Sequence, residues 1–216
     1  MKILAIEFSS NRRGVALLAD GAVLASLHDD MGAATQAFAV LDACLKKAGV
    51  TASQVDRLAI GIGPGSYTAI RVAIAVAQGW HLAHGTELVG VDSFATLAEQ
   101  CRATGLHGTV GMAVDAQRRE LCVARYQVTA KTTELLGPLQ LIPETEFSAW
   151  EASCAHVVGP DIQRWFPNSH PLCSDAETCA RLAAALPPAD PTTLAPVYIR
   201  DAQFVKAAPL NPLYNE

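Results

Sequence analysis

Hydrophobic positions in the first half of the chain alternate between short runs and helical spacing. The runs predict strands at 2–6, 14–19 and 22–27, and Asp20-Gly21 predicts a tight hairpin because glycine tolerates positive φ. Apolar residues three or four apart then predict a helix over 34–48, which Gly49 ends. The chain is therefore expected to open as strand, hairpin, strand and helix.

A second helix is expected over 69–84, after a strand at 56–61. This segment is apolar on nearly every side, and a helix of that kind must be covered on most of its surface. Its alanines and its glycine keep the helix thin, so another backbone can approach it closely. Arg71 and Gln78 are the main interruptions.

The remaining sequence repeats the mixture of strands and helices. Strands are expected at 87–91, 109–115, 120–127, 135–141 and 155–159, and helices at 93–103 and 176–186. Residues 144–154 are ambiguous, and a short helix is one interpretation. Residues 196–200 are expected to be extended.

The loop near residues 102–108 is the best candidate for a domain boundary. Both halves mix adjacent strands with helices, which is typical of an α/β layer. We therefore expect two α/β lobes, residues 1–104 and residues 105–216, with a loose tail from about residue 207.

Composition narrows the class of protein. Of 216 residues, 50% are hydrophobic and 17% are charged, which argues against disorder. The net charge is −5 and no long Lys/Arg stripe occurs, which argues against tight direct binding of nucleic acid. No apolar run reaches the roughly 18–20 residues of a membrane helix, and the start does not resemble a signal peptide. A cytoplasmic protein without membrane contact is the expectation.

The cysteines and histidines do not suggest a metal site or a disulfide framework. None of the six cysteines forms a Cys-x-x-Cys pair, so reduced thiols are expected, with Cys44 and Cys122 buried. His81 and His84 are three residues apart on a helix, but a zinc site needs three or four convergent ligands. Surface or packing roles are favoured for the histidines.

The glycine-rich loop over 61–66 is the most unusual segment of the sequence. It joins a strand to a helix, where Gly63, Gly65 and Ser66 would present backbone N–H groups to a phosphate. It matches neither the Walker loop nor the Gly-x-Gly-x-x-Gly fingerprint. The alternative is a tight turn capped by Ser66 or Thr68.

Two carboxylates lie where strands are expected to end. Glu7 follows the first strand together with small hydroxyl residues, and such a group could hold a metal–phosphate. Asp115 ends a buried strand, where active-site groups of open α/β sheets often lie. The alternative for both is a polar turn residue.

Several stretches together resemble the TsaB family, in the order of the chain. The most specific is Gly63-Pro64-Gly65-Ser66-Tyr67-Thr68 before the alanine-rich helix. The other matching stretches are 3–7, 60–71, 75–79, 90–93, 114–117 and 196–201.

The resemblance implies an actin- and Hsp70-like (ribonuclease H-like) fold with two related lobes. It also implies a non-catalytic dimerisation subunit of the bacterial tRNA threonylcarbamoyladenosine synthase. Such a subunit binds the catalytic TsaD, is joined by the small ATPase TsaE, forms homodimers alone, and meets tRNA only through the complex. It implies no cofactor, with ATP only at a site shared in the complex.

The catalytic relatives carry metal-binding histidines where this chain has residues 91–97 without any histidine, which favours the non-catalytic role and argues against a peptidase. Other departures from the family pattern bear on nucleotide binding and on the partner contact. Glu7-Phe8 stands where the family usually has Asp-Thr, and residues 33–36 replace His-Ser-Glu. The alternatives are an actin-fold enzyme that binds and hydrolyses ATP and, second, a glycoprotease-like peptidase.

The two long helices are the expected partner contacts. Arg71 interrupts an apolar helix, so it is expected to meet a carboxylate or carbonyl across the contact. The competing interpretation is that these faces form only the internal core. The expected contact residues are Phe38, Leu41, Leu45, Tyr67, Ile70, Arg71, Ile74 and Gln78.

Overall fold

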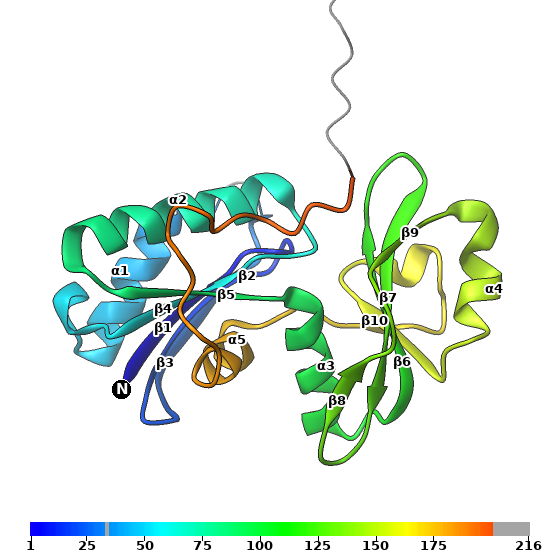
Figure 1. The fold of residues 1–216 in the computed structure, drawn as a ribbon, viewed down its shortest axis with the longest axis horizontal. Helices are drawn as coiled ribbons and strands as arrows, with labels where there is room; N and C mark the ends of the chain where they lie inside the picture. The colour runs from blue at the N-terminus through cyan, green and yellow to red at the C-terminus, as the bar shows by residue number, and fades with distance from the viewer. Residues whose placement is uncertain (33–34, 201–216) are drawn as a thin grey trace, which may run out of the picture.

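Two mixed β-sheets, each with helices on its faces, form two lobes that lie side by side (Figure 1). The computed structural model describes residues 1–32 and 35–200. The first sheet has the strand order β3-β2-β1-β4-β5. Its strands are β1 (Lys2–Glu7), β2 (Arg13–Ala19), β3 (Ala22–Asp29), β4 (Arg57–Gly61) and β5 (Glu87–Val91).

Turn and cap chemistry places the elements of this lobe. Asp20 and Gly21 both have positive φ, so the predicted hairpin between β2 and β3 is confirmed. Gly49 adopts a left-handed conformation (φ 66°) and ends the first helix, as predicted. The helices of the lobe are α1 (Ala37–Ala48), the short 3-10 turn η2 (Ala52–Gln54) and α2 (Tyr67–His84).

The second sheet has the order β11-β10-β6-β7-β8, with β9 also paired to β7. Its strands are β6 (Gly108–Asp115), β7 (Glu120–Val128), β8 (Thr133–Leu135), β9 (Gln140–Pro143), β10 (His156–Gly159) and β11 (His170–Pro171). Its helical segments are η3 (Glu144–Glu146), α4 (Phe147–Glu151) and η4 (Ile162–Arg164). The helices α3 (Ser93–Thr104) and α5 (Ala176–Ala183) complete the chain.

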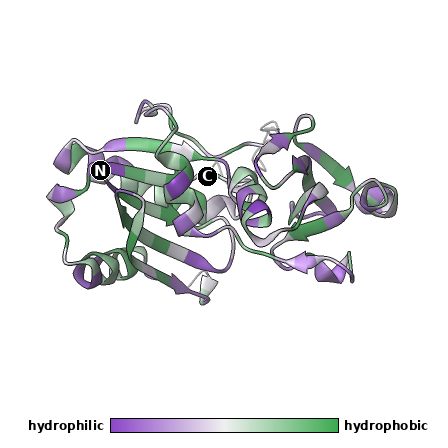
Figure 2. Cartoon of the chain, turned by 90° about the horizontal axis from the view of Figure 1, so that it is seen from below, coloured by the Kyte–Doolittle hydropathy of each residue, from purple (hydrophilic) through white to green (hydrophobic). Residues whose placement is uncertain are grey.

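The two sheets have the same topology, which confirms two related lobes. In the first, β1 lies between antiparallel β2 and parallel β4. In the second, β6 lies between antiparallel β7 and parallel β10. Hydrophobic residues concentrate along the strands of both sheets (Figure 2). The actin- and Hsp70-like arrangement is therefore present.

Each half of the sequence contributes one helix to the lobe that the other half forms. Helix α3 packs on the second sheet, where Phe94, Leu97 and Cys101 join its core. Helix α5 packs on the first sheet, on the face opposite α1 and α2 (Figure 1). The structure therefore differs from the expected division at about residue 104. The chain crosses to the second lobe before α3 and returns to the first before α5, so neither lobe is one continuous half of the sequence.

Three expected elements differ from the structure. The single strand at 135–141 is two short strands, because β8 pairs with one end of β7 and β9 with the other. Helix α1 begins at Ala37 rather than 34, and α5 ends at Ala183 rather than 186. Residues 33–34 and the expected tail from 207 lie outside the described residues.

Candidate functional site

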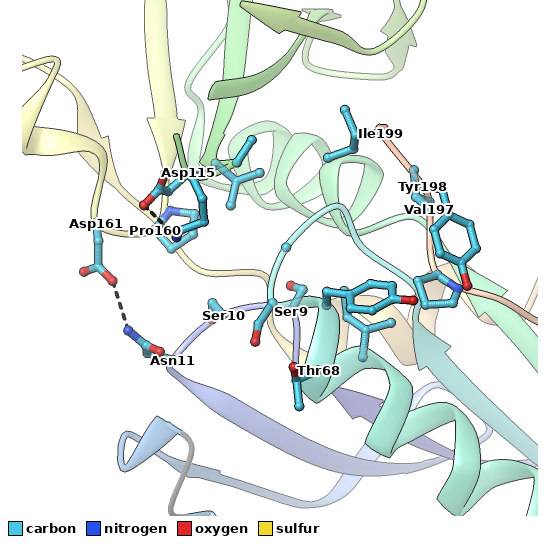
Figure 3. A pocket seen from close by; sticks show the side chains of 18 of the residues that line it. Ser9, Ser10, Asn11, Thr68, Asp115, Pro160, Asp161, Val197, Tyr198 and Ile199 are labelled. Atoms are coloured by element: carbon cyan, nitrogen blue, oxygen red, sulfur yellow. Dashed lines mark hydrogen bonds between the residues drawn. The ribbon is translucent and has the colours of Figure 1, made fainter. Parts of the chain in front are cut away.

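A cleft of about 710 Å³ lies between the two lobes (Figure 3). The first lobe contributes the turn after β1 and the start of α2, and the second contributes the segments that follow β6 and β10. Residues 196–200 form a further wall. The cleft thus lies where the ends of equivalent strands face each other, which is the usual binding position in open α/β sheets.

The glycine-rich loop packs tightly against the turn after β1. The Ser66 N–H donates to the Ser9 carbonyl oxygen at 2.7 Å, and a Cβ at Gly65 would overlap the Ser9 backbone. The Gly63 N–H donates to the Ser93 hydroxyl at 3.2 Å. Two of the N–H groups expected to meet a phosphate are therefore already used inside the protein.

Helix α2 starts at Tyr67 without a side-chain cap. Ser66 occupies the N-cap position, but within the described chain its side chain accepts no capping bond. The structure therefore corrects the alternative in which Ser66 or Thr68 caps the helix. What fixes the loop is its contact with Ser9, not a cap.

Glu7 lies in the interior of the first lobe rather than in the cleft. Its side chain is fully buried, accepts from the Ser9 N–H at 2.8 Å and from the Ser93 hydroxyl at 3.1 Å, and touches Gly61, where a Cβ would overlap the carboxylate. Burial raises the pKa of the Glu7 carboxyl above its usual 4.5, and the hydrogen bonds oppose that rise only in part. The expectation that Glu7 holds a nucleotide-bound metal is corrected by this placement.

Asp115 does lie at the cleft, at the end of β6, which is the counterpart of β1. Its carboxylate accepts from the Gln117 backbone N–H at 2.8 Å and pairs with Arg164. The turn that follows has three consecutive residues with positive φ, from Gln117 to Arg119. The charge of Asp115 is therefore partly neutralised by a cation of its own lobe.

Sequence reasoning missed residues of the second lobe that line the cleft. Asn11 donates to the Asp161 carboxylate at 3.4 Å and links the two lobes (Figure 3). A signal for this segment was present, because a Gly-Pro pair stands at the end of β10 (Gly159-Pro160) and shortly after β4 (Gly63-Pro64). Arg164, which also lines the cleft, gave no such signal, whereas Arg200 lies in the stretch 196–201 that matches the family.

The expected partner contacts fall into two groups by burial. Leu41, Ile70 and Ile74 are 2%, 2% and 6% exposed and belong to the core of the first lobe, which corrects the expectation that they face a partner. Leu45 is partly buried against the same core. Gln78 donates to the Pro191 carbonyl oxygen at 2.7 Å, so its amide is used within the chain.

Phe38, Tyr67 and Arg71 are exposed instead, and Tyr67 also lines the cleft. Phe38 is 73% exposed and Tyr67 is 47% exposed. The Arg71 guanidinium lies 5.4 Å from the centre of the Tyr67 ring, so it has a cation–π contact on its own helix. The expectation that Arg71 meets a group of a partner stays a prediction.

The cysteines are free thiols, as expected, and Cys44 and Cys122 are buried. Burial raises their pKa values to about 11 and about 12, so both thiols stay protonated near neutral pH. No cluster of three potential metal ligands occurs in residues 1–32 and 35–200. Over the same ranges, no helix combines the length and hydropathy needed to cross a membrane.

Comparison with known proteins identifies the family. The family model described as "TsaD: tRNA N6-adenosine threonylcarbamoyltransferase" matches residues 34–148, which is more than half of the chain. The chain belongs to this family. Three TsaB proteins are among the similar curated relatives, which confirms the resemblance found in the sequence.

Three relatives carry the name "tRNA threonylcarbamoyladenosine biosynthesis protein TsaB". The protein of Escherichia coli is 33% identical over 128 residues, which is 59% of this chain and 55% of the relative. The protein of Haemophilus influenzae is 30% identical over 161 residues, which is 70% of this chain and 66% of the relative. The chain thus spans less than two thirds of these TsaB relatives.

A solved structure of "YeaZ from Pseudomonas aeruginosa" extends the match to nearly the whole chain. It is 27% identical with a TM-score of 0.78, and the alignment covers 91% of this chain and 99% of that one. A second structure from Pseudomonas aeruginosa is described as similar to "peptidase YEAZ", with the same identity and TM-score. The TsaB assignment therefore holds for the fold as well as for the sequence.

Proposed function

We propose that this protein is a non-catalytic accessory subunit in the formation of threonylcarbamoyladenosine in tRNA. The observation that carries the proposal is the similarity to TsaB proteins named for that biosynthesis. In this proposal the protein binds a TsaD-like transferase in the cytoplasm and pairs with itself when alone. A TsaE-like ATPase joins the complex, and tRNA is met only through it.

The contact surface we propose is the outer face of α2, with Phe38 of α1 on the same side of the sheet. Val72 is 41% exposed and Leu82 is 85% exposed on this face, together with Tyr67 and Arg71. Helix α2 contains no carboxylate and no lysine. Aromatic residues and arginine are enriched where binding energy concentrates, and exposed apolar patches of this kind mark interaction sites.

The polar groups of the cleft and of the first lobe's interior support a role without chemistry of its own. The Glu7 carboxylate is hydrogen-bonded inside the first lobe, and the Ser66 N–H is bonded to Ser9. Asp115 is paired with Arg164. We propose that the chain needs no cofactor, and that ATP binds only at a site shared in the complex.

The volume of the cleft favours one rival, an actin-fold enzyme that binds ATP. Isothermal titration of the chain alone with ATP and magnesium separates the two proposals. Micromolar binding that Asp115→Ala abolishes would support the enzyme. The accessory role predicts no such binding.

Co-expression with the TsaD-like protein of the same organism tests the contact surface. Val72→Asp places a charge on the exposed face of α2, and we expect it to weaken the complex about ten-fold or more, or about 1.4 kcal/mol. The complex is followed by gel filtration and by titration of the purified partners. The melting temperature of the isolated variant should change little, because Val72 is exposed.

Leu135→Asp is the matched control, because Leu135 is also 41% exposed but lies on β8 of the second lobe. It should leave the complex intact. Equal affinity of the Val72→Asp variant and the wild type would contradict the proposed surface.

A further inference from the structure

The segment from residue 189 to residue 200, here called the strap, touches both lobes. It runs from α5 past β5 and along α2 to the mouth of the cleft (Figure 1). Because residues 196–200 line the cleft, the strap forms one of its walls. Access to the cleft therefore depends on where the end of the strap lies.

The first part of the strap is firmly attached to the first lobe. Its backbone bonds are Ala189 N–H to the Leu88 oxygen at 2.7 Å and Val197 N–H to the Ile62 oxygen at 2.9 Å. Leu194 packs against the hydrophobic core of that lobe. These contacts combine backbone hydrogen bonds with burial of an apolar side chain, and both resist release.

The last three residues reach across to the second lobe by side-chain contacts. The Tyr198 ring lies 5.8 Å from the Tyr67 ring at the start of α2. Ile199 packs at the margin of the second lobe's core, and Arg200 pairs with Glu120. The Arg200 and Glu120 side chains are about one third exposed, and exposed ion pairs stabilise only weakly.

The chain crosses between the lobes at the opposite side of the cleft, where a single serine ties the crossings together. Ser93 donates its N–H to the Gly63 oxygen at 2.8 Å and accepts from the Ser174 hydroxyl at 2.8 Å. Ser93 is the first residue of α3, at the outward crossing from β5, and Ser174 lies on the return crossing before α5. These buried bonds make a compact hinge region.

We propose that Tyr198, Ile199 and Arg200 form a releasable latch that holds the two lobes at their observed opening. The serine-tied crossings act as the hinge, and the strap up to Val197 stays attached to the first lobe when the latch opens. Release of the latch widens the cleft and exposes its two walls, one carrying Asp115 and the other Asn11. This device does not depend on the proposed accessory role.

Hydrogen exchange and small-angle X-ray scattering of the full chain test the latch. The variant Ile199→Ser/Arg200→Ala should raise the radius of gyration. It should also speed amide exchange in segments 9–13 and 114–120 about two- to five-fold, the range that a weak exposed pair supports. The Val197 amide should keep its protection, because its bond to Ile62 belongs to the first lobe.

Arg119→Ala is the matched control, because Arg119 pairs with Glu144 inside the second lobe. It should leave the scattering and the exchange of segment 9–13 unchanged. The charge-swapped double variant Glu120→Arg/Arg200→Glu should restore the wild-type rate of amide hydrogen exchange, while Arg200→Glu alone should not. Circular dichroism confirms that each variant is folded.

Two results would overturn the latch. One is unchanged scattering and exchange in the folded double variant. The other is loss of Val197 protection in step with the cleft segments, because the strap would then leave as a whole. The single variant Arg200→Ala keeps the test decisive if the double variant fails to fold.

Discussion

At the residue scale, the position of Glu7 shows how burial determines the behaviour of a carboxylate. The side chain is fully buried and accepts two hydrogen bonds, yet desolvation still raises its pKa above 4.5. A carboxyl whose folded pKa is raised binds its proton more tightly in the folded state. Its contribution to stability is therefore complete below the unfolded pKa and is lost as the pH rises through the folded value.

Glu7→Gln should remove this loss of stability at higher pH. The amide keeps an oxygen that can accept from Ser9 and carries no charge to desolvate. We expect the melting temperature of the variant to gain on the wild type as the pH rises from about 4.5 towards 8. Thermal unfolding followed by circular dichroism at a series of pH values measures the difference.

Glu7→Ala separates the charge from the packing. It removes the charge as well, but it leaves the Ser93 hydroxyl and the Ser9 N–H without their acceptor, so it should destabilise the protein at every pH. A constant difference between Glu7→Gln and the wild type across this pH range would show that Glu7 does not carry the predicted linkage.

The sequence could place Glu7 after a strand but could not show that it is buried. Its neighbour Phe8 is also fully buried, with the Arg13 guanidinium 5.8 Å from its ring. A turn with two serines looks exposed in sequence. Here the glycine-rich loop covers it, because Gly65 allows direct backbone contact with Ser9. Such a close approach between distant segments leaves no periodic pattern.

At the element scale, local signals predicted most of the structure. The helix expected at 93–103 is present as α3, and Asp92 caps it by accepting from the Ala95 N–H at 2.9 Å. The edge of the second sheet was predicted poorly, because Gly137-Pro138 interrupts its pairing and separates β8 from β9. Strand pairing depends on a partner strand, and sequence periodicity does not report it.

Helix α5 offers an element-scale prediction. Asp175 accepts from the Thr178 N–H at 2.7 Å and from its hydroxyl at 3.1 Å, which caps a helix of only eight residues. A helix this short is not stable alone, so its cap supports its packing on the first sheet. Asp175→Ala should lower the free energy of unfolding by about 1 kcal/mol in urea denaturation.

Asp175→Asn distinguishes the cap from the charge. Asparagine caps helices as well as aspartate does, so this variant should keep most of the stability. It also removes a negative charge that helps to raise the pKa of Glu7. If alanine and asparagine destabilise the protein equally, the charge of Asp175 matters and the cap does not.

At the scale of the whole molecule, the sequence indicated two related lobes but not the exchange of helices between them. The loop near residues 102–108 was the predicted boundary, because each half of the chain mixes adjacent strands with helices. Helix α3 nevertheless buries Phe94 and Leu97 in the second lobe, and α5 buries Cys179 and Ala183 in the first. Which sheet an amphipathic helix covers is decided by the tertiary path of the chain.

This exchange predicts that the two lobes unfold together. Each lobe needs a helix from the other half of the sequence, so neither core is complete while the other is unfolded. Tryptophan fluorescence can follow each lobe, because Trp80 lies in the first while Trp150 and Trp165 lie in the second. Trp80→Phe reports on the second lobe, and Trp150→Phe/Trp165→Phe reports on the first.

Within each reporter variant, we expect the fluorescence transition in urea to coincide with the far-ultraviolet circular dichroism transition. The comparison is made inside one variant, so the cost of the tryptophan substitution cancels. Phe94→Ala should lower the free energy of unfolding by about 3–5 kcal/mol. Added to the variant in which Trp80 is the reporter, it should lower the urea midpoint of the Trp80 fluorescence transition, although Phe94 lies in the core of the second lobe. Two separated transitions, or a Trp80 midpoint that does not respond to Phe94→Ala, would mean that the exchanged helices do not couple the lobes.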